Sequence, residues 1–78
     1  MRGTIGAKLR KQRGELTLAQ VDAGTGIDKA ILSRVERNES APSVRTLKVL
    51  ANFYQVGDDV LLDWIDTAAA GHKRKSAA

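Results

Sequence analysis

Apolar residues recur through the second half of the chain at the spacing of one helix face. In the segment 44–54 the apolar positions are three, four or seven residues apart, which is the period of an amphipathic helix. The predicted buried stripe of this segment consists of Val44, Leu47, Leu50, Ala51 and Tyr54. Segment 59–69 carries a second stripe, made of Val60, Leu61, Trp64 and Ile65 with Leu62 beside it. No segment shows the convincing apolar–polar alternation of a strand.

The first half of the chain shows the same period over shorter stretches. It predicts three helices, at residues 5–13, 18–24 and 29–37. In the last of these, we expect Ile31, Leu32 and Val35 to be buried, because they follow one another at i, i+1 and i+4. The remaining positions of that helix are small or basic, so its outer face is suited to lie close to a polyanion.

Capping residues and turn residues mark the ends of these helices. Four predicted N-caps precede a helix: Thr4, Thr17, Asp28 and Ser43. Gln20 stands three residues after Thr17, which is the spacing of a capping box. Predicted turns or helix ends are Gly14, Gly26 and Asn38, which are residue types that tolerate positive φ. The sequence therefore predicts an all-α fold of five helices in one compact domain.

Size and composition exclude several classes of function. A chain of 78 residues makes one domain, predicted here at residues 1–70 and followed by a disordered basic tail at 71–78. Cysteine is absent and His72, the single histidine, lies in the tail, so we expect no metal, no cofactor and no catalytic site. No run is apolar enough to cross a bilayer, and no signal-peptide pattern is present. We expect a soluble cytoplasmic protein with no membrane partner.

The charged residues are unevenly distributed along the chain. Residues 1–48 hold ten Lys or Arg and five Asp or Glu, whereas residues 49–70 hold four Asp and no basic residue. A basic part joined to an acidic last helix favours one face for a polyanion and another held away from it. The alternative is a set of solvated charges without a partner.

Two motifs carry a resemblance to a known family. They are GIDKAILSRVE at residues 26–36 and PSVRTL at residues 42–47. With the capped helix before them, they resemble the Cro/repressor class of helix-turn-helix DNA-binding domains. That class includes phage repressors, xenobiotic-response-element regulators and restriction–modification controller proteins. The resemblance extends over about residues 4–66 and implies a five-helix, lambda-repressor-like fold with the third helix in the major groove.

The resemblance also implies roles for individual residues. The residues that correspond to base readers are Lys29, Ala30, Ser33 and Arg34. Those expected at phosphates are Arg10, Thr17, Arg37, Ser43, Arg45 and Lys48. Each exposed basic residue among them has an alternative interpretation as a solubilising charge. Arg13 and Glu36 match a largely buried ion pair that the family places behind the third helix.

Two positions depart from the family pattern. Leu18 replaces a glutamine that commonly bridges a phosphate and the third helix, and Asp22 replaces an alanine that packs against it. A carboxylate at that place needs a partner or an escape to solvent. Either the second helix is rotated so that Ala23 points inward, or Asp22 finds a hydrogen-bond donor. A third interpretation is that DNA binding has been lost.

The apolar residues of the C-terminal part predict a dimer surface. The residues expected there are Phe53, Val56, Leu61, Leu62, Trp64 and Ile65. The alternative is that Trp64 and Leu61 complete the core of a single chain. A small domain that reads a palindrome is expected to act as a two-fold dimer, because one copy makes limited contacts.

These observations together favour a sequence-specific DNA-binding transcription regulator. We expect a repressor or controller-type autoregulator that binds double-stranded DNA at a palindromic operator as a homodimer, in a bacterial or phage context. The alternative is a protein-interaction module, an antitoxin or antiactivator, that keeps the fold and binds a protein partner. Salt dependence separates the two, because phosphate contacts release counterions.

Overall fold

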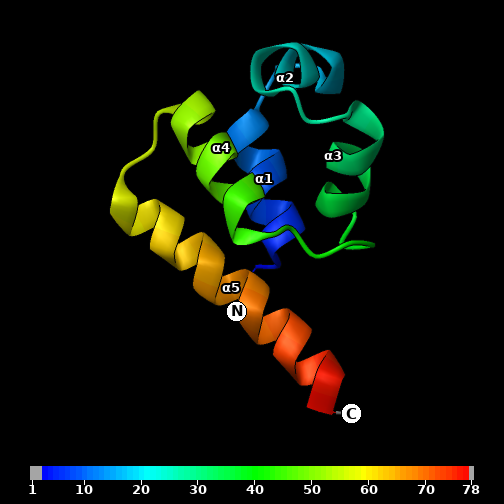
Figure 1. Cartoon of the computed structure of the whole chain (residues 1–78), viewed down its shortest axis with the longest axis vertical. Helices are drawn as coiled ribbons and strands as arrows, with labels where there is room; N and C mark the ends of the chain where they lie inside the picture. The colour runs from blue at the N-terminus through cyan, green and yellow to red at the C-terminus, as the bar shows by residue number, and fades with distance from the viewer. Residues whose placement is uncertain (1–2, 78) are drawn as a thin grey trace.

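Five helices follow one another in the computed structural model, which describes the backbone of residues 3–77 and the side chains of residues 3–70. They are α1 (Ile5–Arg13), α2 (Leu18–Thr25), α3 (Lys29–Glu36), α4 (Val44–Tyr54) and α5 (Asp58–Ala77). Within residues 3–77 no strand is present. Figure 1 shows α1 near the middle of the domain, with α3 and α4 on either side of it in this view. The predicted all-α, five-helix fold is confirmed.

Side-chain caps begin the first, second and fourth helices where the sequence predicts them. The Thr4 hydroxyl accepts the N–H of the residue three positions on, and Ser43 does the same for α4. Thr17 accepts the N–H of Gln20, whose side-chain oxygen accepts the N–H of Thr17 in return, at 3.1 and 2.8 Å. The predicted capping box is therefore confirmed. Each of these bonds satisfies a backbone donor that a helix start leaves without an intrahelical partner.

The core is built from one or two large side chains of each helix. The buried apolar residues are Ile5, Leu9, Val21, Leu32, Val35, Leu47, Leu50, Ala51 and Trp64. Within this arrangement α3 packs against α1 and α2, while α4 packs against α2 and α5. Only Leu32 and Val35 of α3 are buried, so α3 keeps a broad surface that the other described side chains do not cover.

Two side chains predicted to be buried are exposed. Ile31 is 49% exposed on α3, and Val44 is 48% exposed at the first position of α4. Neighbouring residues of a helix point about 100° apart, so Leu32 and Val35 fill the narrow contact of α3 and leave Ile31 outside it. Val44 is the first residue of α4 and lies outside the core, and Leu47 is the first residue of this helix that is buried.

The last helix is longer than the sequence predicts. It continues to Ala77, although we expected it to end near Ala69 and to be followed by a disordered tail from residue 71. Three alanines, Ala68 to Ala70, precede Gly71, and alanine has the highest helix propensity, so a single glycine does not end the helix. The division into a domain at residues 1–70 and a tail at 71–78 stays a prediction. The side chains of the basic tail lie outside the described residues.

Helix α1 and the end of α3 are joined by a close backbone approach. A Cβ atom on Gly6 would meet the carbonyl oxygen of Glu36, and that of Val35 at 2.7 Å, so only glycine fits there. Asn38 follows α3 at φ 62°, which confirms its predicted positive φ. Its side chain accepts the N–H of Gly6 and donates to the hydroxyl of Thr4, both at 3.0 Å. No local sequence pattern predicts this second role of Asn38, because its partners lie more than thirty residues away.

We predict that Gly6→Ala destabilises the fold by about 2 kcal/mol, because the new methyl group forces the α1–α3 contact apart. Urea denaturation followed by the fluorescence of Trp64, the one tryptophan of the chain, measures this change. Gly3→Ala is the matched control, since a Cβ there would find its nearest described neighbour at 4.0 Å. Equal stability of the two variants would contradict the close approach.

Candidate nucleic-acid interface

The turn between α2 and α3 is held by a continuous set of hydrogen bonds. The Thr25 hydroxyl donates to the carbonyl of Val21 at 2.7 Å and accepts the N–H of Ile27 at 3.1 Å. Gly26 takes φ 79°, as the sequence predicts, and its N–H donates to the carbonyl of Asp22 at 2.7 Å. A non-glycine side chain in this left-handed region would be strained. The turn therefore fixes where α3 begins.

Two carboxylates cap the first turn of α3. Asp28 accepts the N–H of Ala30 at 2.7 Å, which confirms the predicted N-cap. Asp22, from α2, accepts the N–H of Lys29 at 3.0 Å. Asp22 is half-buried while Ala23 is exposed, so Asp22 finds a donor and Ala23 does not turn inward. Both carboxylates also face the positive end of the α3 dipole, which favours negative charge.

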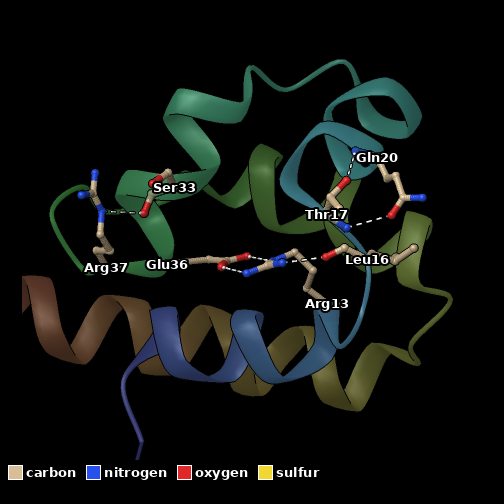
Figure 2. Close-up of polar contacts among 7 residues, drawn as sticks. All are labelled: Arg13, Leu16, Thr17, Gln20, Ser33, Glu36 and Arg37. Atoms are coloured by element: carbon tan, nitrogen blue, oxygen red, sulfur yellow. Dashed lines mark hydrogen bonds and ion pairs between the residues drawn. The ribbon is translucent and has the colours of Figure 1, made fainter.

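The free face of α3 brings together three of the four predicted base readers. Lys29, Ala30 and Arg34 are exposed. Ser33 is half-buried, and its carbonyl accepts a hydrogen bond from the Arg37 guanidinium at 3.3 Å (Figure 2). Ser33 therefore lies at the edge of this face. In chemical terms the face offers two flexible cations and a methyl group.

Behind α3, Arg13 and Glu36 form a two-point ion pair (Figure 2). The Arg13 Nε donates to one Glu36 oxygen at 2.8 Å, and its Nη2 donates to the other at 2.9 Å. A third hydrogen bond reaches the carbonyl of Leu16 at 2.6 Å. The side chains are only 17% and 10% exposed. The predicted ion pair is present, and it ties the end of α1 and the loop before α2 to the last turn of α3.

The surroundings of this pair shift two pKa values. The hydrogen bonds to Glu36 raise the pKa of the Arg13 guanidinium above its ordinary value, against the opposing effect of burial. Burial raises the pKa of the Tyr54 phenol, and the nearby Glu36 charge raises it further. Arg13 thus stays charged beside Glu36.

The predicted phosphate residues are spread over four elements. Thr17 and Ser43 stand at the N-termini of α2 and α4, where their hydroxyls serve as caps. Arg37 lies 3.4 Å from Glu39, which offsets part of its charge. The other three are exposed basic residues: Arg45 and Lys48 on α4 and Arg10 on α1.

The predicted dimer residues differ in exposure. Leu62 is 60% exposed, whereas Trp64 is 3% exposed and belongs to the core of a single chain. Including Trp64 in the dimer surface was therefore wrong: it faces inward from α5 and fills the core. The remaining predicted residues, Phe53, Val56, Leu61 and Ile65, are half-buried and pack against that core. Within residues 3–77, no helix is both long and apolar enough to span a membrane.

Comparison with known proteins agrees with this geometry. The family model described as helix-turn-helix matches residues 7–61, from α1 to the start of α5. The chain belongs to the helix-turn-helix family. It is also 48% identical, over 44 residues, to a protein named HTH-type transcriptional regulator SutR from Escherichia coli (strain K12). The aligned segment covers 56% of this chain and 24% of that relative, so the match spans about a quarter of the relative's length. No solved structure matches the chain.

Family membership confirms the resemblance drawn from residues 26–47. Leu18, one of the two departures, is half-buried and packs against the core. Ile31 is the residue of the free face of α3 that sequence reasoning missed. The sequence does hold a hint that Ile31 is exposed. A short helix buries only a narrow stripe of its surface, and Ile31, one residue before Leu32, points about 100° away from it.

We predict that Arg13→Ala destabilises the protein by about 3 kcal/mol, because Glu36 would be left buried without its partner. Lys11→Ala, an exposed site on the same helix, should change the free energy of unfolding by much less. Replacing both Arg13 and Glu36 with methionine should cost less than Arg13→Ala alone. A thermal melt of Arg13→Ala equal to that of the wild type would refute the role of the pair.

Removing the carboxylate of Asp22 should weaken the start of α3. We expect Asp22→Ala to cost about 1 kcal/mol, the usual value of a helix cap, and Asp22→Asn to cost less because it keeps an oxygen acceptor. Asp66→Ala, at an exposed carboxylate of α5, is the control. Urea denaturation measures all three, and amide exchange of the Lys29 N–H reports the bond directly. Unchanged exchange at Lys29 in Asp22→Ala would exclude the cap.

Proposed function

We propose that this chain is a sequence-specific DNA-binding transcription regulator that inserts α3 into the major groove of an inverted repeat as a homodimer. Membership of the helix-turn-helix family supports DNA binding, and the name of the SutR relative supports a role in transcription. The observation that carries the proposal is that α3 is held in one orientation and exposes one face. It is fixed at both ends by polar contacts from other elements, and it exposes small and basic residues together with Ile31.

The base readers on this proposal are Lys29, Ala30 and Arg34, with Ser33 at the edge. Arg34 is long enough to donate two hydrogen bonds to guanine O6 and N7, and Lys29 can donate to the same acceptors. Ala30 lets the helix lie close to the base edges and can contact a thymine methyl group. Ser33, half-buried, is suited to a base or a phosphate at the margin of the contact.

Phosphate contacts then fix the position of α3 along the duplex. Thr17 and Ser43 lie at helix N-termini, where the helix dipole and the backbone N–H groups favour an anion. Arg45 and Lys48 add positive charge on α4. Arg37 and Arg10 complete the proposed set, and Glu39 offsets part of the charge of Arg37.

A homodimer is proposed because two copies supply two recognition helices for a two-fold site. The exposed Leu62 and the half-buried Leu61 and Ile65 on α5 offer the apolar surface for it. Bound at a promoter, such a dimer acts most simply as a repressor or as an autoregulator. The alternative of a protein-interaction module is less favoured, because Leu18 packs on the core and Asp22 caps α3.

Selection of bound duplexes from a random pool tests this proposal. We expect an enriched inverted repeat, bound more weakly as salt rises because phosphate contacts release counterions. Arg34→Ala should lose roughly 1–3 kcal/mol of binding free energy on the selected duplex and relax specificity at one base pair. Lys11→Ala, at an exposed site outside the proposed contacts, is the control. No enriched sequence, with salt-independent binding, would contradict the proposal and favour a protein partner.

A further inference from the structure

An apolar side chain is exposed on α3 beside Arg34, at the edge of the proposed reading face. Ile31 is 49% exposed, whereas its neighbour Leu32 is 3% exposed. Among the described residues, Ile31 belongs neither to the buried core nor to the partly buried apolar residues packed against it. The fold therefore gains little from an apolar side chain at this position.

Helix propensity does not account for Ile31 either. A β-branched residue is a poorer helix former than alanine, leucine, glutamate or lysine, because its χ1 angle is restricted by the preceding turn. The same restriction holds the side chain in one preferred rotamer. Ile31 thus presents a rigid alkyl group to solvent and loses little side-chain entropy when something packs against it.

The neighbours of Ile31 indicate what would pack against it. It follows Ala30 in the first turn of α3, and Lys29 and Arg34 are exposed on the same short helix. An alkyl side chain offers no hydrogen bond to a base edge. In the major groove the apolar group that it can recognise is the methyl group on C5 of a pyrimidine.

We propose that Ile31 is a specificity-determining residue that recognises the C5-methyl group of a pyrimidine. This inference rests on the proposed function, because it requires α3 to lie in the major groove. Around the axis of α3, Ile31 lies about 60° from Arg34, because three residues of a helix turn through about 300°. Thymine carries the methyl group in unmodified DNA, and 5-methylcytosine carries the same group at the same place. Ile31 therefore contacts the methyl group in the same way whether thymine or 5-methylcytosine carries it.

The test uses the full chain and the duplex obtained by selection. Each thymine of one half-site is replaced in turn by uracil, which removes the methyl group and leaves the Watson–Crick pair intact. At one position we expect wild-type binding to weaken about four-fold, the value of one buried methyl group. Ile31→Ala should weaken binding to the thymine duplex by a similar factor and bind the thymine and uracil duplexes equally.

A second arm distinguishes the sources of the methyl group. At the sensitive position, a cytosine–guanine pair is compared with a 5-methylcytosine–guanine pair. We expect methylation to restore about four-fold in affinity for the wild type and to have no effect on Ile31→Ala. Val44→Ala is the matched control, because Val44 is an apolar side chain of nearly equal exposure on another helix. It should respond to uracil as the wild type does.

The outcomes separate this inference from the function on which it rests. Sequence-specific, salt-dependent binding in which every uracil duplex equals its thymine duplex would overturn the role of Ile31 and leave the function standing. A wild-type response to uracil in Ile31→Ala would overturn that role in the same way. Failure to select any duplex would instead reject the function, and with it this inference. Because Ile31 is exposed, circular dichroism should show Ile31→Ala folded as the wild type is.

Discussion

The bidentate pair between Arg13 and Glu36 fixes the element on which the proposed function depends. Helix α3 is eight residues long and buries only Leu32 and Val35, so apolar contact alone would leave its orientation poorly defined. The pair crosses from the end of α1 to the last turn of α3 with two hydrogen bonds of 2.8 and 2.9 Å. Buried ion pairs add little net stability compared with apolar packing, but breaking one is costly. We infer that this pair is kept for the orientation that it enforces.

Two other polar contacts also restrict the orientation of α3. Asp22, on α2, accepts the first N–H of the helix, and Asn38, two residues after its end, accepts the N–H of Gly6 near the start of α1. Three polar contacts therefore hold α3 in place, so its free face needs little further ordering of the backbone when it binds a partner. Helix α3 packs mainly against α1 and α2. The acidic residues of the C-terminal part are on another helix, α5: Asp58, Asp59, Asp63 and Asp66.

Features that depend on neighbouring residues were predictable from the sequence, and features that depend on packing were not. The caps at Thr4 and Thr17 and the positive φ of Gly26 were confirmed because a few adjacent residues determine them. Ile31 and Val44 were predicted buried because periodicity gives the direction of a stripe but not its width. Trp64 was assigned to a partner surface because sequence cannot tell which of two apolar surfaces a side chain joins. The donor for Asp22 required the angle between α2 and α3, which no local pattern contains.

Backbone amide chemical shifts of the ¹⁵N-labelled protein, followed during titration with the selected duplex, test the central claim most directly. If α3 is a pre-oriented reading helix, the largest changes will fall at residues 29–34 and at the N-termini of α2 and α4. The amides around Glu36 will move little, because the ion pair is already formed in the free protein. Changes concentrated on α5, or a large rearrangement around Arg13 and Glu36, would contradict it.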